Sequence, residues 1–231
     1  MLILSLDTTA RNGSVAILRD GVVVVEQAGD PALTHAQRLP IDLMNACAAA
    51  GVTIADVELF AVAAGPGSFT GLRVGIATIQ GLAIARNRKV VAVSTLEAIA
   101  AAAPADAAVV AAWMDAQRGE VFAQVFRRTA AGGQSITGAI SAAPRAALDV
   151  HEHALEGAAF HGDGAVRYHA EILAVRGPSA RVADGIVPLA GAIARLAEAR
   201  AEGAVLPHAI VPVYVRRPDA EIARDRRSSS P

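Results

Sequence analysis

The chain has 231 residues, of which 53% are hydrophobic and 19% are charged. At about 150 residues per domain, this length predicts one large domain or two small ones, with enough apolar residues for a core. Only 3% of the residues are aromatic, so we expect a core built mainly from Ala, Val, Leu and Ile. The formal net charge of −1 argues against a strongly basic surface for nucleic acid.

The chain carries a single cysteine, Cys47, so no intrachain disulfide is possible. Its position on an apolar helical face predicts a small buried hydrophobe rather than a reactive thiol. The Ala-rich residues 98–114 are broken by Pro104 and Asp106, and the apolar run before Asp7 is too short for a signal peptide. We therefore expect a cytoplasmic protein without a membrane span.

Three antiparallel strands are predicted at the beginning of the chain. Residues 2–6 form an apolar run, and residues 14–19 and 22–26 flank the dipeptide Asp20-Gly21. Asp-Gly between two apolar runs is a strong signal for a two-residue hairpin turn.

A helix is predicted from Thr34 to Ala50, with Gln37 in the capping-box position. Its apolar residues recur at helical spacing, and the shared face is formed by Leu39, Leu43, Met44 and Cys47.

A glycine-rich loop is predicted in the middle of the first half. Residues 65–75 read Gly-Pro-Gly-Ser-Phe-Thr-Gly-Leu-Arg-Val-Gly, and they lie between an apolar run, residues 59–64, and a periodic segment that reaches Arg86. This order predicts a strand, a tight loop and a helix that Ser68 or Thr70 can cap. Backbone N–H groups at such a helix start attract anions such as phosphate. The alternative is that Gly-Pro-Gly only turns the chain.

The helix that follows the loop is unusually rich in glycine. Gly71, Gly75 and Gly81 each cost about 1 kcal/mol relative to Ala in a helix interior. So many glycines in one helix indicate that another backbone passes close by. That backbone is either the protein's own sheet or a partner's helix.

The second half of the chain repeats the first in outline. A strand that ends in Asp115 is followed by a glycine-closed turn and a second strand, as is the strand that ends in Asp7. Residues 162–164, Gly-Asp-Gly, follow an apolar run and precede a helix, as Gly65-Pro66-Gly67 do in the first half. Two related lobes are therefore predicted, although short strand-turn-helix units also recur by chance.

The glycine loop and four further motifs point together to one family. The loop is the most specific of them, and the others are Leu6-Asp7-Thr8-Thr9, Ser94-Thr95-Leu96-Glu97, Asp115-Ala116-Gln117-Arg118-Gly119-Glu120-Val121-Phe122 and Pro212-Val213-Tyr214-Val215-Arg216. With these motifs, which span nearly the whole chain, the sequence resembles the bacterial TsaB (YeaZ-like) family.

The resemblance implies the duplicated actin-like ATPase (ribonuclease H-like) fold, an α/β architecture of two lobes with mixed sheets and flanking helices. We expect an N-terminal lobe over residues 1–103, with the glycine loop and the docking helices, and a C-terminal lobe over residues 104–215. Residues 216–231 are polar, charged and serine-ended, so we expect a flexible tail there.

The resemblance also implies a function. Family members are implied to be non-catalytic subunits that dock on the catalytic relative TsaD, activate it, and are joined by an ATPase subunit, TsaE. The complex transfers a threonylcarbamoyl group from an adenylate to the adenosine beside the anticodon of tRNA. In isolation a homodimer is expected, and tRNA is met only through the complex.

The implied docking surface is the pair of helices over residues 34–50 and 70–86. On the second helix, the residues that can face the sheet are Leu72, Ile76, Ile79 and Ala83. The expected interface residues are Thr34, Leu39, Leu43, Cys47, Gly71, Gly75, Thr78 and Leu82. A bulky residue at Gly75 should then abolish TsaD binding and leave the monomer folded.

The alternative function is that of an actin-like-fold ATPase or metal-dependent enzyme acting on its own. Asp7 and Asp115 stand at equivalent strand ends, where such ATPases hold a metal-bound nucleotide, but each can instead cap its own turn. TsaD is implied to bind metal through two histidines four residues apart, whereas His35 is followed four positions later by Leu39. We therefore expect no catalytic residue, no metal site and no cofactor.

Overall fold

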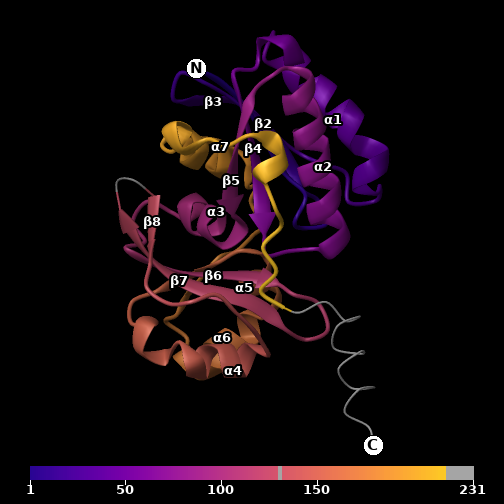
Figure 1. The fold of residues 1–231 in the computed structure, drawn as a ribbon. Coiled ribbons are helices and arrows are strands. Elements are labelled where there is room, and N and C mark those ends of the chain that lie inside the picture. Colours follow the sequence, from indigo (N-terminus) through magenta and orange to yellow (C-terminus); the bar gives the residue numbers. More distant parts are fainter. Residues whose placement is uncertain (130–131, 217–231) are drawn as a thin grey trace, which may run out of the picture.

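The first lobe is built around β1 (Leu2–Asp7), whose six residues are all buried. The computed structural model describes residues 1–129 and 132–216, and Figure 1 shows two lobes with one sheet each. In the first sheet the strands lie in the order β3-β2-β1-β4-β5. The other four strands are β2 (Ser14–Arg19), β3 (Val22–Ala28), β4 (Leu59–Gly65) and β5 (Lys89–Ser94).

The predicted hairpin joins β2 to β3. Asp20 and Gly21 both have positive φ, 50° and 82°, as the favoured two-residue hairpin turn requires. β1, β2 and β3 pair antiparallel, whereas β4 and β5 add to β1 in parallel. The three antiparallel strands predicted at the beginning of the chain are confirmed.

The second sheet repeats the topology of the first. Its strands are β6 (Val109–Asp115), β7 (Val121–Thr129), β8 (Gly132–Ser135), β10 (Ala159–His161) and β11 (Arg181–Val182), with β9 (Ile140–Ala142) paired to β7. The order β8-β7-β6-β10-β11 matches β3-β2-β1-β4-β5 strand for strand, with the same parallel and antiparallel pairings. The internal repeat predicted from the sequence is therefore confirmed.

Helices cover the sheets and also fill the space between them (Figure 1). The α-helices are α1 (His35–Ala49), α2 (Phe69–Ala85), α3 (Thr95–Ala102), α4 (Pro144–Val150), α5 (Asp163–Arg167), α6 (His169–Arg176) and α7 (Ala190–Glu198). Four short 3-10 helices are η1 (Ile54–Asp56), η2 (Glu152–Ala154), η3 (Ala201–Gly203) and η4 (Pro207–Ala209). α1 and α2 lie side by side and share one apolar core with the first sheet.

Both lobes contribute to a single apolar core around α3 and α7. This core joins Val93 of β5 and Leu96 of α3 to Val110 and Phe126 of the second sheet and to Leu196 of α7. Burial of apolar surface stabilises such contacts by about 25 cal/mol per Å². The two sheets are therefore packed through α3 and α7.

The division between the lobes differs from the predicted one. Residues 104–215 were assigned to the C-terminal lobe, but α7 packs on the first sheet, where Ser5 Oγ donates to the Ala190 carbonyl at 2.7 Å. Val205 forms a β-bridge with Val90 of β5, and Val213 N donates to the Ala64 carbonyl of β4 at 2.7 Å. The chain thus returns to the first lobe, because α7 buries an apolar face of the first sheet.

The predicted flexible tail lies outside the described residues, apart from Arg216. The Arg216 Nη1 lies 3.2 Å from Glu120 Oε2, so the last described residue is tied to the second lobe. None of the helices in the described ranges is both long and apolar enough to cross a lipid bilayer.

Candidate functional site

The inner side of α2 explains two of its glycines. A Cβ atom at Gly71 would overlap the Thr8 carbonyl oxygen, and one at Gly75 would overlap Thr8 Oγ1. Thr8 Oγ1 also donates to the Gly71 carbonyl at 2.7 Å. The backbone that passes close to these glycines is therefore the protein's own, at the end of β1.

The glycine loop is packed against the same strand end. Gly65 has φ of 120°, and a Cβ there would overlap the Val213 carbonyl oxygen. Ser68 N donates to the Thr9 carbonyl at 2.9 Å, and Gly71 N donates to Ser68 Oγ at 3.2 Å. Two amides that would face an anion are thus already bonded within the chain, so the loop turns and anchors the helix.

The eight expected interface residues fall into two groups. Leu39, Leu43, Cys47, Gly71 and Gly75 are buried within the first lobe. Thr34 is exposed, and Thr78 and Leu82 are half-buried. The buried residues support the helices from within, and a bulky residue at Gly75 would disturb the monomer itself, contrary to our expectation.

The outer side of the helix pair carries exposed apolar side chains that the sequence interpretation missed. The exposed fractions are 61% for Ile41, 68% for Met44 and 65% for Ile84. The sequence interpretation placed Met44 on one face with Leu39, Leu43 and Cys47, but one residue turns a helix by about 100° and brings Met44 to the outside of the buried Leu43. The sequence does contain a sign of this second apolar face. Ile41 and Met44 are three residues apart, so they lie on one side of the helix, which differs from the side of Leu39 and Leu43.

Gly81 belongs to the outer side of α2. A Cβ atom at this position would meet no heavy atom of residues 1–129 and 132–216 within 4 Å, so the fold of these residues does not require glycine here. Ala77 and Ile84 are exposed on the same side of the helix. We call Ile41, Met44, Ala77, Gly81 and Ile84 the outer face.

An aromatic cluster closes the N-terminal end of α2. The Phe69 and Tyr214 rings stack with centroids 5.4 Å apart, and the Arg73 guanidinium lies 3.9 Å from the Phe69 centroid. Arg73 Nε also donates to Tyr214 Oη at 3.3 Å. The cluster fastens the C-terminal segment, which runs from the first lobe to the second in Figure 1, to the beginning of α2.

Asp7 at the end of β1 caps its own turn. Its Oδ1 accepts hydrogen bonds from Thr9 N at 2.8 Å and from Thr9 Oγ1 at 2.6 Å. Burial raises the pKa of Asp7, although the bonds from Thr9 oppose the shift. This arrangement confirms the capping interpretation for Asp7.

Asp115, the counterpart of Asp7 in the second lobe, is also engaged. Its Oδ1 accepts from Gln117 N at 3.0 Å, and its Oδ2 lies 3.0 Å from Arg167 Nη1. Asp163 Oδ1 accepts from Asp115 N at 3.0 Å. Burial, followed by the nearby charges of Asp115 and Asp7, raises the pKa of Asp163 to about 6.

A small cavity lies between the lobes at these carboxylates. It has a volume of about 60 Å³, and its polar lining comes from Asp7, Asn12, His161 and Asp163. Ligand pockets for drug-sized molecules measure about 300–1,000 Å³. Within the described ranges, no group of three or more His, Cys, Asp and Glu side chains is placed to hold a metal ion.

His35 has a partner of its own at the beginning of α1. Its Nδ1 lies 2.8 Å from Nη2 of Arg38, a buried arginine that also pairs with Asp42. Burial, and then the charge of Arg38, lowers the pKa of His35. His35 therefore helps to order the start of α1.

The fold and the comparisons with known proteins agree on the class of protein. The two mixed sheets with flanking helices are the duplicated actin-like ATPase (ribonuclease H-like) fold. The profile of the family described as TsaD, tRNA N6-adenosine threonylcarbamoyltransferase, matches residues 30–169. YeaZ from Pseudomonas aeruginosa superposes with a TM-score of 0.73 at 29% identity, covering 92% of this chain and 99% of that one.

Sequence relatives narrow the class to a family. The tRNA threonylcarbamoyladenosine biosynthesis protein TsaB of Escherichia coli (strain K12) is 36% identical over 130 residues, 55% of this chain and 56% of the relative. An uncharacterized protein of Mycobacterium tuberculosis (strain ATCC 25618 / H37Rv) is 33% identical over 223 residues, 95% of this chain and 93% of the relative. The chain belongs to the TsaB (YeaZ-like) family. Its alignment spans a little over half the length of the Escherichia coli TsaB.

Proposed function

We propose that this chain is a non-catalytic subunit of the complex that installs the threonylcarbamoyl group on tRNA. It docks on the catalytic subunit TsaD through the outer face of α1 and α2. In this proposal the chain works in the cytoplasm, TsaE joins the complex, and tRNA is reached through the complex. The same outer face serves a homodimer when TsaD is absent.

The outer face is the observation that carries the proposal. Ile41 and Met44 of α1 and Ile84 of α2 are each more than 60% exposed. Exposed apolar side chains gathered on adjacent helices are typical of a surface that binds another protein. Gly81, with open space above it, allows a foreign helix to approach the backbone of α2 closely.

The small cavity at Asp7 and Asp163 supports the proposal that the subunit is non-catalytic. Asp7 and Asp115, at the strand ends where actin-like ATPases hold a nucleotide, accept hydrogen bonds from their own turns. A cavity of about 60 Å³ is several times smaller than the pockets that hold drug-sized ligands. The chain then activates TsaD by binding its competent conformation more tightly than the others, which shifts the population toward it.

Titration of purified TsaD with the chain, followed by calorimetry, tests the proposal. Ile84→Glu should weaken the complex by about 100-fold, because it places a charge in an apolar contact. Val150→Glu is the matched control, since Val150 on α4 is also 65% exposed but lies on the second lobe. Equal affinities for TsaD in the two variants would contradict docking through the outer face.

Calorimetry with ATP and Mg²⁺ tests the rival function, an ATPase acting on its own. We expect no saturable binding at micromolar concentrations. Micromolar affinity together with turnover that disappears in Asp7→Ala would replace the proposal with the enzyme.

A further inference from the structure

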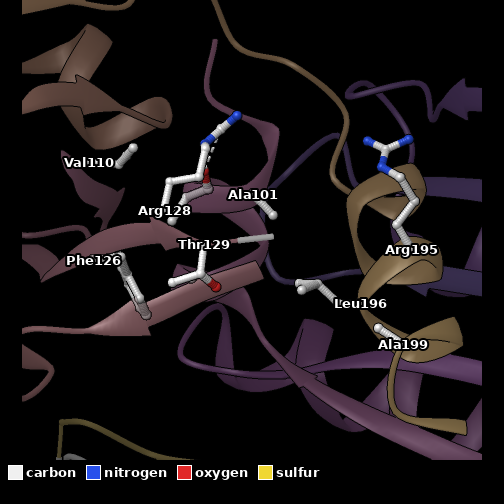
Figure 2. Close-up of a pocket in the computed structure, with 10 residues that line it drawn as sticks. Ala101, Val110, Phe126, Arg128, Thr129, Arg195, Leu196 and Ala199 are labelled. Atoms are coloured by element: carbon white, nitrogen blue, oxygen red, sulfur yellow. Dashed lines mark hydrogen bonds between the residues drawn. The ribbon is translucent and has the colours of Figure 1, made fainter. Parts of the chain in front are cut away.

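A second cavity lies between the lobes, away from the carboxylates and from the outer face. Its volume is about 200 Å³, and its walls come from α3, from β6, β7 and β8 of the second sheet, and from α7 on the first. Figure 2 shows the wall formed by β7 facing the wall formed by α7. The apolar part of the lining consists of Ala100, Ala101, Val110, Phe126, Leu196 and Ala199.

Two arginines stand on opposite walls of this cavity. Arg128 lies on β7 and Arg195 on α7, and among the described residues no carboxylate side chain contributes to the lining. In Figure 2 both guanidinium groups lie in the upper part of the view, above Phe126 and Leu196. The cavity therefore combines two positive charges with an apolar interior.

Arg128 binds the end of α3 with one nitrogen of its guanidinium, and another nitrogen has no hydrogen-bond partner among the described residues. Its Nη2 donates to the carbonyls of Ala100 and Ala103 at the C-terminal end of α3, with 3.2 Å to Ala100. Among the described residues its Nε is buried without a hydrogen-bond partner. The guanidinium is thus held in place at the cavity by the end of α3.

Arg195 has no such role in the described part of the chain. Its side chain is exposed, and no ion pair or hydrogen bond within residues 1–129 and 132–216 engages it. A guanidinium binds carboxylate and phosphate oxygens in a fork geometry, with bonds about twice as strong as neutral ones. Arg195 is therefore available to a ligand that enters the cavity.

We propose that this cavity binds a small organic anion, a carboxylate or phosphate head attached to a compact apolar body. The head lies between Arg128 and Arg195, and the body packs on Val110, Phe126 and Leu196. An apolar cavity of about 150 Å³ admits benzene, so about 200 Å³ holds a ring-sized body with its head at the rim. Because one wall is the second sheet and the opposite wall is α7, which packs on the first sheet, the bound anion fastens α7 to β7.

Amide chemical shifts of the full chain, titrated with benzoate, test this site. We expect saturable shifts in α3, β7 and α7, and binding weaker by about tenfold or more for benzamide, which keeps the shape of benzoate and lacks its charge. Phenyl phosphate titrated in parallel identifies the preferred head group, and tighter binding of either anion upholds the proposal.

Two variants assign the shifts to this cavity. Arg195→Gln should weaken benzoate binding by about tenfold, and Ala199→Leu, which adds side-chain bulk to the cavity lining, should remove it. Arg88→Gln controls for the lost charge, because Arg88 is exposed in the turn between α2 and β5. Shifts that stay linear to about 20 mM benzoate, equal binding of benzamide, or unchanged affinity in Arg195→Gln would each overturn the proposal.

Discussion

The two lobes share a strand order but use their second helices differently. In both lobes a glycine with positive φ lies at the end of the strand parallel to the first, Gly65 of β4 at 120° and Gly162 after β10 at 107°. At each of them a main-chain carbonyl, of Val213 or of Trp113, occupies the position that a Cβ would take. The next helix has 17 residues in the first lobe, α2, and 5 in the second, α5, where α6 begins two residues after α5 ends.

The difference separates the part of α2 that the fold requires from the part that the proposed docking uses. The beginning of each helix lies close to the end of the first strand of its lobe: Gly75 packs on Thr8, and a Cβ at Gly164 would lie 2.8 Å from the Met114 carbonyl carbon. The additional turns of α2 carry Ile84, which is 65% exposed, and Gly81, where a Cβ would meet no heavy atom of the described residues within 4 Å. The outer face therefore includes a part of α2 that has no counterpart in α5.

Among these variants, Gly75→Leu should lower the free energy of unfolding the most. The new side chain would overlap Thr8 Oγ1 under a buried part of α2, so we expect a loss of about 3 kcal/mol or more in the free energy of unfolding. Urea denaturation followed by circular dichroism measures it. A change below about 1 kcal/mol would show that Gly75 is not needed for the close approach to Thr8.

Much of this fold follows from local patterns in the sequence. The apolar run before Asp7, the Asp20-Gly21 turn and the second glycine triplet at residues 162–164 predicted the strands and the repeat, because each depends only on neighbouring residues. The return of α7 to the first sheet was not predictable in this way. It depends on Ser14 Oγ accepting from the amides of Leu189 and Ala190, which are 175 and 176 residues away in the chain.

The proposed docking surface lies on two helices that the sequence predicted, whereas the surroundings of their side chains were not predictable. The glycines indicated correctly that a backbone lies close to α2. Nothing in the spacing of Gly71, Gly75 and Gly81 tells which of them meets the protein's own chain, because that depends on where Thr8 lies in space. For the same reason, Leu39 was placed among the expected interface residues, although it is buried.

Asp163 occupies the position in the second lobe that Pro66 occupies in the first. The pH dependence of stability tests whether its carboxyl is buried between the lobes. Its pKa of about 6 lies above the value of about 3.9 in an unfolded chain, so the native state holds the proton more tightly. The stability from this carboxyl is complete below the unfolded pKa and is lost as pH rises through 6. Between pH 4 and pH 7, Asp163→Asn should therefore gain roughly 2 kcal/mol relative to the original chain.

Urea denaturation of both proteins at several pH values measures that difference. Asp7 and His161 line the same cavity and have shifted pKa values, so only the difference between the two proteins isolates Asp163. Asp184→Asn, which removes an exposed carboxylate, controls for net charge. Parallel stability curves for Asp163→Asn and the original chain would show that the carboxyl is not desolvated between the lobes.

Gly81→Leu should have the smallest effect on stability. Because a Cβ there meets open space, the helix gains about 1 kcal/mol or less from losing a glycine. The monomer should therefore unfold at the same or slightly higher urea concentration, in contrast to Gly75→Leu on the same helix.

TsaD affinity of the stable Gly81→Leu monomer, measured by calorimetry, tests docking through the outer face most directly. A leucine at this position prevents a foreign helix from approaching the backbone of α2, so we predict at least tenfold weaker binding with the fold intact. Full affinity for TsaD in this variant would contradict the account.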